Sequence, residues 1–267
     1  MVFSMELLWL FVAALVISAI GFKNYVWFIS LGYGFSIAGE GLLMLLLYRQ
    51  RLTPGMILGC VLFILYGLRL GGYLAFREAK SSSYRKNMTG EIKDGKTIPF
   101  GVKVSIWVTC ALLYVTQVCG VFYRLHNGAA DNIAVYIGAG IMALGLILET
   151  AADLQKNAAK KRNPKRFVDT GLYRLVRCPN YLGEMIFWTG ALVCGIGAVR
   201  HWGQWILIAV GYIGIIFVMF SGARRLELRQ DKNYGNDPEY QKYVKTVPIL
   251  LPFIPLYSVK KHKWLVA

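Results

Sequence analysis

The sequence predicts an all-α, polytopic membrane protein with about seven transmembrane helices. Of its 267 residues, 56% are hydrophobic and only 16% are charged, so long apolar stretches must alternate with charged connections. A hydrocarbon core of about 30 Å requires about 20 apolar residues per helix, and the chain supplies stretches of that length repeatedly. A soluble globular domain is a poor fit to this pattern.

Seven stretches are candidate transmembrane helices. They are residues 5–21, 25–48, 54–76, 102–122, 133–150, 181–199 and 202–220. The first is not an obvious cleaved signal, because no Lys or Arg precedes it and Glu6 lies where a basic segment would be expected. We therefore expect it to be retained as the first helix.

The basic residues are distributed unequally between the connections. Seven spans place 25 of the 30 Lys and Arg residues on one side of the membrane and four on the other, with Arg69 inside a span. The positive-inside rule then predicts an N-terminus outside and a C-terminus in the cytoplasm. This distribution accounts for the net charge of +16 better than a nucleic-acid partner does.

The cysteines, histidines and glycines exclude several classes of site. The five cysteines form no CxxC pair and the three histidines are scattered, so neither a disulfide framework nor a metal site is expected. Residues 138–143 fit the GxGxxG/A pattern of dinucleotide-binding folds, but they lie inside an apolar span that no strand precedes. Small residues there are more typical of close helix packing, so we expect no Rossmann domain.

Ionisable residues inside the spans are candidates for catalysis. Glu40 follows a glycine-rich stretch, and Arg69 lies three positions after Tyr66, which puts Tyr66 and Arg69 on one helical face. Such groups are costly in hydrocarbon and indicate function by default. The alternative is a structural ion pair between neighbouring helices.

Three basic elements fall on the predicted cytoplasmic side. Residues 149–164 carry a run of bases that is typical of a surface facing anionic lipid headgroups. Residues 171–184 place Arg174 and Arg177 just before Pro179, where a helix start and two arginines suit a diphosphate. The tail after residue 223 interleaves arginines with tyrosines, which suits either a stacked nucleotide base or an interfacial aromatic belt.

Between residues 149 and 252 these elements resemble the membrane-embedded steroid 5α-reductases, the sterol C14 and C7 reductases and their bacterial relatives. Residues 155–164 are similar to the Q-K-N-x-F-R-x-N-P segment of that superfamily, with Lys160 in place of its arginine. Residues 177–184, R-C-P-N-Y-L-G-E, are similar to its R-H-P-N-Y-x-G-[DE] signature, with Cys178 in place of the histidine. Residues 225–248 resemble its R-x-E, K-Y-G and Y-x-x-V-P pattern.

The resemblance implies a single domain whose residues 1–130 face the substrate and whose residues 131–267 bind NADPH. The residues that it assigns to the cofactor are Asp153, Lys156, Lys160, Arg174, Arg177, Asn180, Tyr181, Glu184, Arg225, Glu227, Tyr234, Tyr240 and Tyr243. In the N-terminal half, Tyr66 and Arg69 are similar to the Tyr-x-x-Arg of steroid 5α-reductases, and Glu40 would be the catalytic glutamate.

The implied reaction is the NADPH-dependent reduction of a carbon–carbon double bond conjugated to a carbonyl. A steroid or another lipophilic substrate would enter from the bilayer of a bacterial inner membrane or the endoplasmic reticulum. A Glu40–Tyr66 pair would donate a hydrogen bond to the carbonyl oxygen, where charge develops in the transition state, and Arg69 would orient one of the two.

Two alternatives remain. Isoprenylcysteine carboxyl methyltransferases share the C-terminal architecture and an R-H-P-x-Y-x-G motif, which allows a transferase that uses S-adenosylmethionine. Cys178 lacks the ring donor of their histidine, whereas Asn180 and Glu184 follow the reductase version of the motif. The second alternative is a sterol-binding membrane module without turnover.

Overall fold

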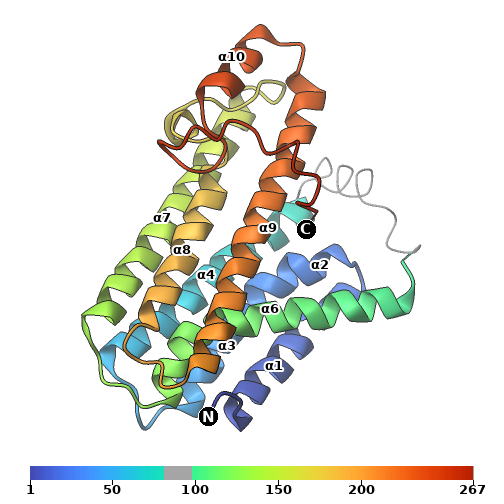
Figure 1. The fold of residues 1–267 in the computed structure, drawn as a ribbon. Coiled ribbons are helices and arrows are strands. Elements are labelled where there is room, and N and C mark those ends of the chain that lie inside the picture. Colours follow the sequence, from blue (N-terminus) through green and yellow to red (C-terminus); the bar gives the residue numbers. More distant parts are fainter. Residues whose placement is uncertain (81–97, 267) are drawn as a thin grey trace. The chain divides into compact units, whose positions relative to one another are not determined.

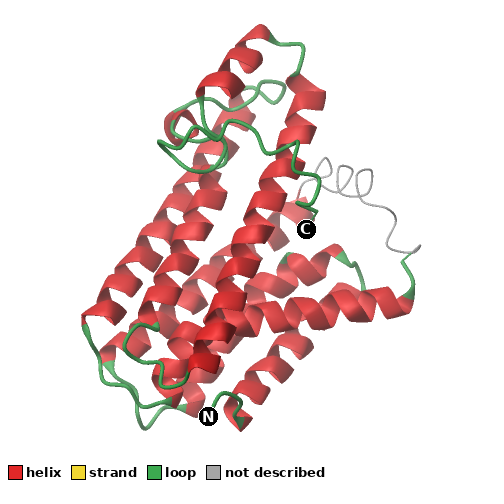
Figure 2. Cartoon of the chain, viewed as in Figure 1, coloured by secondary structure: helices red, strands yellow, loops and turns green. Residues whose placement is uncertain are grey.

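The computed structural model describes residues 1–80 and 98–266, and this part of the chain consists of helices and loops without a strand (Figure 2). The α-helices in chain order are α1 (Met5–Ser18), α2 (Val26–Ile29), α3 (Leu31–Leu47), α4 (Pro54–Lys80), α6 (Phe100–His126), α7 (Ile133–Arg162), α8 (Pro179–Cys194), α9 (Trp202–Tyr234) and α10 (Pro238–Thr246) (Figure 1). Two 3-10 helices, η1 (Ala19–Phe22) and η3 (Gly171–Arg174), accompany them. Most of the basic connection between Arg77 and Lys103 lies outside the described residues.

Five helical segments in the described ranges are long and apolar enough to cross a membrane. They are Met5–Phe22, Pro54–Ala79, Phe100–His126, Ile133–Arg162 and Trp202–Tyr234. The second and sixth expected spans correspond to shorter helices, α3 with 17 residues and α8 with 16. Sixteen residues rise about 24 Å, which is less than the core of about 30 Å. The all-α, polytopic class is confirmed, and the orientation of the termini stays a prediction.

The expectation of one continuous helix over residues 25–48 was wrong. Ser30, with φ −119° and ψ −86°, separates α2 from α3. Its hydroxyl donates a hydrogen bond of 2.9 Å to the carbonyl of Val26, and Gly32 and Gly34 follow directly. A serine that bonds to the backbone of the preceding turn competes with the helix, and glycine has a low helix propensity, so the helix breaks here.

Helices α7 and α9 continue beyond the ends that hydropathy predicted, residues 150 and 220. Ala, Leu, Gln, Lys and Arg are good helix formers, so α7 runs on until the Asn163-Pro164 dipeptide, which ends it. Helix α9 ends at Tyr234, before a glycine, and α10 starts at Pro238 with the Asp237 carboxylate as its N-cap. The two extensions carry most of the charged residues of the candidate site.

The chain divides into two compact units. Unit 1 contains residues 1–139 and 191–212, and unit 2 contains residues 140–190 and 213–267. In unit 1, α3 packs closely on α4, and a Cβ added at Gly67 would lie 2.2 Å from the carbonyl oxygen of Gly34. In unit 2, a Cβ at Gly145 would lie 2.6 Å from the carbonyl oxygen of Gly183. Glycine therefore allows both pairs of helix backbones to touch.

Of the small residues at 138–143, which were expected to permit close helix packing, Gly138 and Ala139 are buried, but Gly140 is exposed. A Cβ at Gly140 would have nothing within 4 Å. A close approach of two helix backbones occurs at Gly145, about one and a half helical turns after Gly140.

One end of unit 1 gathers the connections that follow the second, fourth and sixth expected spans, together with the N-terminus. The bonds that join them are Thr53 Oγ1 to Asp131 Oδ1 (2.5 Å), Asn127 Nδ2 to the carbonyl of Ala198 (2.8 Å) and Gln204 Nε2 to the carbonyl of Met1 (3.0 Å). Helices that alternate in direction bring these segments to one end, as the seven-helix expectation requires.

Candidate functional site

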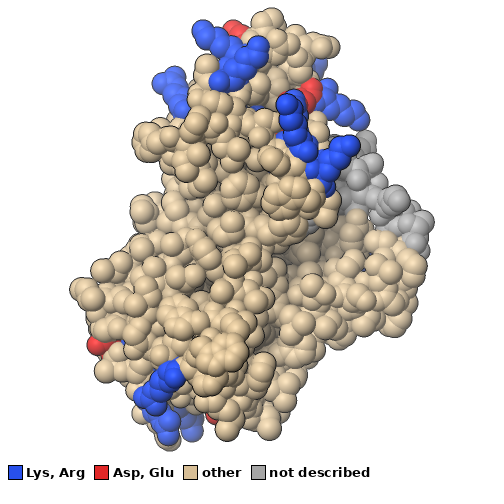
Figure 3. Space-filling model, in the orientation of Figure 1, with Lys and Arg blue, Asp and Glu red and all other residues tan. Residues whose placement is uncertain are grey.

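Unit 2 contains a pocket between the C-terminal parts of α7 and α9, the loop after α7 and the start of α8. Its lining residues are Lys156, Lys160, Phe167, Val168, Tyr173, Arg177, Asn180, Leu226, Arg229, Gln230, Asn233 and Tyr234. Four of these are basic, three are aromatic and none is acidic. A cavity lined by charge of one sign concentrates ligands of the other, so the pocket favours an anion. On the face of unit 2 seen in Figure 3, Lys and Arg side chains gather near α10 and the end of α9.

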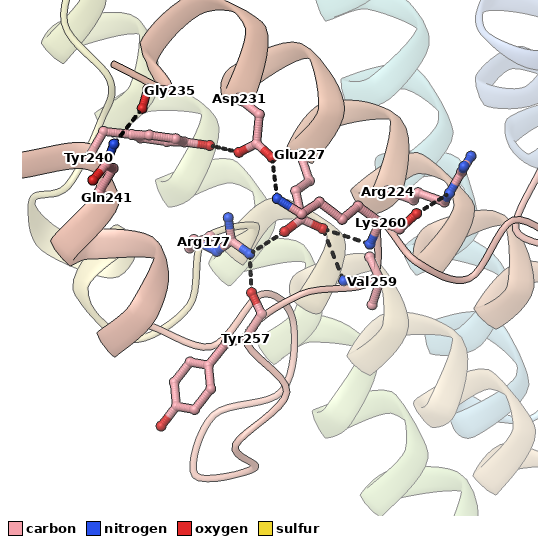
Figure 4. A network of polar contacts seen from close by, with 10 residues as sticks. All are labelled: Arg177, Arg224, Glu227, Asp231, Gly235, Tyr240, Gln241, Tyr257, Val259 and Lys260. Atoms are coloured by element: carbon pink, nitrogen blue, oxygen red, sulfur yellow. Dashed lines mark hydrogen bonds and ion pairs between the residues drawn. The ribbon is translucent and has the colours of Figure 1, made fainter. Parts of the chain in front are cut away.

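Arg177 is the buried cation of this pocket, with only 2% of the residue exposed. Its Nη2 donates to Glu227 Oε1 at 3.1 Å and to the carbonyl of Tyr257 (Figure 4). Its Nε and Nη1 have no hydrogen-bond partner within the described ranges. Buried donors of a charged group that lack a partner are costly, and an anionic acceptor in the pocket would satisfy them. Arg177 is therefore the strongest ligand-binding candidate.

Glu227 holds the C-terminal segment against α9. Its Oε1 accepts from Arg177, and its Oε2 accepts from the backbone N–H groups of Val259 (2.9 Å) and Lys260 (3.0 Å) (Figure 4). The side chain is 3% exposed, so these bonds are shielded from water. Both oxygens are used by the protein, which makes Glu227 a positioning residue for Arg177 and the tail.

Lys160 and Tyr234 join the loop after α7 to α9. The Lys160 ammonium donates to the Tyr234 hydroxyl (2.8 Å), to the carbonyl of Pro164 (3.2 Å) and to that of Arg166. Since an ammonium has three donors, this side chain orders the loop and contributes its charge to the pocket. Arg166 in the same loop pairs with Glu239 and Asp169. The hydrogen bonds to these two carboxylates, of which the one to Glu239 has the larger effect, raise the pKa of the Arg166 guanidinium.

Tyr240 and Tyr243 build the wall behind the pocket and do not line it. Both are buried and pack with Phe167 in one aromatic cluster. The Tyr240 hydroxyl donates to Asp231 Oδ1 (2.8 Å) and the Tyr243 hydroxyl donates to the carbonyl of Tyr173 (2.7 Å). Burial raises the pKa of both phenols, so they stay neutral donors.

The pocket brings together five of the thirteen residues that the resemblance assigned to the cofactor. These are Lys156, Lys160, Arg177, Asn180 and Tyr234. The others that lie outside its lining are Asp153, Arg174, Tyr181, Glu184, Arg225, Glu227, Tyr240 and Tyr243. Arg174 and Arg225 are exposed. The Tyr181 ring packs against α9 at Gly222, where an added Cβ would lie 3.4 Å from the ring.

Sequence reasoning missed the pocket residues of α9. Leu226, Arg229, Gln230 and Asn233 recur at steps of three and four, which is one face of a helix. The seventh span was predicted to end at residue 220, so residues 226–233 were not considered as part of a helix. A helix extended to Tyr234 would have predicted this face.

Cys178, in place of the histidine of the similar motif, is a buried thiol at the start of α8. Its backbone N–H donates to the carbonyl of Ile249 (3.0 Å), and burial raises the pKa of the thiol to about 12. The side chain is therefore a weak neutral donor. In residues 1–80 and 98–266, no three His, Cys, Asp or Glu side chains come together as a metal site.

The catalytic candidates lie in unit 1. Glu40 in α3 is fully buried, and neither carboxyl oxygen has a hydrogen-bond partner in the described part of the chain. The Tyr66 hydroxyl donates to the Tyr33 hydroxyl at 3.0 Å instead of to Glu40, and Gln117 Nε2 donates to the same Tyr33 oxygen at 3.3 Å. Tyr33 and Glu40 lie seven residues apart on α3, which places them on one helical face.

Arg69 does not orient Glu40 in this structure. Its guanidinium carbon lies 5.9 Å from the centre of the Tyr73 ring, a cation–π arrangement one helical turn further along α4. The carboxyl oxygens of Glu40 accept no bond from it.

The comparisons with known proteins give a family. No curated protein and no solved structure matches the chain. A family model described as "Protein of unknown function (DUF1295)" matches residues 10–247, which include the pocket of unit 2 and the buried polar groups of unit 1. The chain belongs to the DUF1295 family.

Proposed function

We propose that the protein is an NADPH-dependent membrane reductase of a carbon–carbon double bond conjugated to a carbonyl in a steroid-like or other lipophilic substrate. One observation carries the proposal. Arg177 is buried in a basic and aromatic pocket without acidic residues and has two donors without a partner. The association of DUF1295 with steroid 5α-reductase-like membrane proteins supports the same reading.

The charges of the pocket residues suit a phosphate group of a dinucleotide. Arg177 would bind phosphate oxygens through Nε and Nη1, and Lys156 and Arg229 would add positive charge. Asn180 offers an amide to a sugar or nicotinamide group, and Tyr234 offers a ring for stacking. When bound, NADPH would supply the reducing equivalent.

The chain would supply the acid from unit 1. A carbonyl oxygen that gains charge in the transition state needs a preorganised donor, and Glu40 is a buried carboxyl whose oxygens are not engaged by the protein. The Tyr66 hydroxyl donates to the Tyr33 hydroxyl, so in this scheme Tyr66 positions Tyr33 and does not donate to the substrate. The surrounding apolar helices would exclude water and admit a lipophilic substrate.

A transferase that uses S-adenosylmethionine is the second candidate. Its cofactor is a zwitterion with a sulfonium, whereas four basic and no acidic side chains line the pocket. That balance favours a ligand with several negative charges. A sterol-binding module without turnover is the third candidate, and it has no need of an anion pocket.

Thermal unfolding of the detergent-purified protein with NADPH, NADH or S-adenosylmethionine tests the proposal. A ligand at 100 times its Kd stabilises the folded state by about 2.7 kcal/mol. We expect NADPH to raise the midpoint most. A shift with S-adenosylmethionine alone would favour the transferase, and no shift with any of the three would contradict both enzyme classes.

A further inference from the structure

The C-terminal segment forms a loop that is tied to the start of α8. The carbonyls of Pro248 and Ile249 accept from the N–H groups of Arg177 (2.9 Å) and Cys178 (3.0 Å), immediately before α8 begins. The loop is closed by a bond from Ile249 N–H to the carbonyl of Leu256 (2.8 Å). In Figure 1 this segment is the dark red irregular chain after α10. The base of the loop is therefore fixed to the point where α8 starts.

The tip of this loop is apolar and makes little contact with the protein. Phe253 is 98% exposed and Ile254 is 50% exposed, whereas Leu250 at the base is fully buried. Phe253 has φ 65°, and no other non-glycine residue in the described ranges has a positive φ. Glycine or asparagine is the usual residue in this conformation. An aromatic side chain held there and pointing away from the protein indicates a contact outside the described chain.

The flanking residues point to a lipid surface as that contact. Residues 247–267 contain three lysines and no Asp or Glu, and Lys261 and Lys263 are exposed just after the loop. Trp264 beside them is 65% exposed. Apolar and aromatic residues beside lysines are the composition of segments that lie in the headgroup region, where each basic residue is attracted to anionic lipids.

Helix α10, which precedes the loop, has a polar surface that faces water. Helix α10 exposes Gln241, Lys242 and Lys245 and buries its tyrosines, as a helix in water does. The chain thus changes from a water-facing helix to an exposed apolar loop within eight residues. A step from water to lipid explains this change, because α8 begins at the base of the same loop.

We propose that residues 252–255 insert into the headgroup–acyl boundary of an anionic bilayer, with Phe253 as the deepest side chain and the following lysines on the headgroups. This anchor would fix the tail that Glu227 holds and, through Pro248, the backbone at Arg177. The proposal uses no property of a cofactor or a reaction, so it stands apart from the proposed function.

Fluorescence quenching of the full chain in nanodiscs tests this anchor. Phe253→Cys is labelled with the fluorophore NBD, and Gln241→Cys on α10 is the matched control. The unmodified protein, treated identically, measures labelling of the native cysteines. Because Phe253 is 98% exposed, the substitution is expected to leave the thermal midpoint unchanged. Ile254→Cys supplies a second position on the loop if it does not.

Nitroxide-labelled lipid is expected to quench the label at residue 253 several-fold more than the control, and iodide in the water is expected to quench it several-fold less. Adding phosphatidylglycerol to phosphatidylcholine discs should increase the lipid quenching at residue 253. Equal iodide quenching at the two positions would overturn the proposal. A label at residue 253 shielded from both quenchers would overturn it as well, because protein would then cover the loop.

Discussion

The buried ion pair of Arg177 and Glu227 is asymmetric. The two side chains are 1% and 3% exposed and meet at 3.1 Å. Both carboxylate oxygens are occupied by protein donors, whereas two of the guanidinium nitrogens have no partner among the described residues. The carboxylate thus has a structural role, and the guanidinium keeps binding capacity for a ligand.

Replacing Glu227 with Ala is expected to destabilise the fold. Removal of one member of a buried pair leaves the other charge uncompensated and typically costs about 3–5 kcal/mol. We expect a lower thermal midpoint and faster tryptic cleavage in the tail at Lys260 and Lys261. Glu239→Ala, which breaks the exposed pair with Arg166, is the control, since such pairs contribute about 0–1 kcal/mol. Equal midpoints for the two variants would show that Glu227 does not hold the tail.

Asp131 is expected to make the stability of unit 1 depend on pH. Desolvation opposes its ionisation, but hydrogen bonds from Thr53 Oγ1, Gly55 N–H and the Tyr136 hydroxyl outweigh it and lower the pKa of the carboxyl. A carboxyl with a lowered folded-state pKa stabilises the fold above its unfolded value of about 3.9, and the contribution is lost as pH falls through the lowered value.

Asp131→Asn tests that dependence. At neutral pH we expect the variant to be less stable by about 0.3–1 kcal/mol, because the amide keeps an acceptor oxygen but removes the negative charge that faces the first turn of α4. Thermal midpoints measured from pH 7 downward should converge with those of the wild type below pH about 3.9. A constant difference across that range would mean that the ionised carboxylate has no special role.

Gly67→Ala is expected to disrupt the packing of α3 on α4. A methyl group there would lie 2.2 Å from the carbonyl oxygen of Gly34 and 2.6 Å from the backbone nitrogen of Ala38, so one helix must move. Gly72→Ala in the same helix is the matched control, because a Cβ there has nothing within 4 Å. The control should be neutral or more stable by about 0.5–1 kcal/mol from helix propensity. Comparable yields of folded Gly67→Ala and Gly72→Ala protein, by size-exclusion chromatography, would contradict the close contact.

Glu40→Gln is expected to abolish turnover of an enone substrate and to leave NADPH affinity nearly unchanged. The amide retains the size of the side chain but cannot donate a proton to the developing enolate. Tyr66→Phe, which removes only the hydroxyl bonded to Tyr33, should reduce the rate less. Full activity of Glu40→Gln in a spectrophotometric NADPH assay would remove Glu40 from the mechanism.

Hydropathy predicted the helices that have long apolar stretches, because burying or shielding about 20 apolar residues leaves few alternatives. It failed at Ser30, where a local side-chain bond breaks the helix, and at residues 150 and 220, where helix propensity continues beyond the apolar part. Hydropathy identifies the part of a helix that can lie in lipid, whereas the end of the helix depends on the helix propensity of the residues that follow.

The candidate site was predicted in part for a similar reason. Motif similarity identified Arg177, Asn180 and Lys160, which lie in the pocket. It could not separate Arg177 from the exposed Arg174, because which of two nearby arginines is buried depends on the carbonyl of Tyr257, 80 residues away in sequence. The assignment of Tyr240 to the cofactor overlooked Asp231, which accepts the bond of its hydroxyl.

The affinity of NADPH for Arg177→Gln, compared with that for Arg225→Gln, tests the anion pocket most directly. Both variants remove one positive charge, but Arg177 is buried in the pocket and Arg225 is exposed outside its lining. At constant ionic strength we expect Arg177→Gln to weaken binding roughly 10- to 100-fold, the value of a hydrogen bond to a charged group, and Arg225→Gln to weaken it less than about threefold. Equal affinities of the two variants would contradict the assignment of Arg177 as the ligand-binding cation.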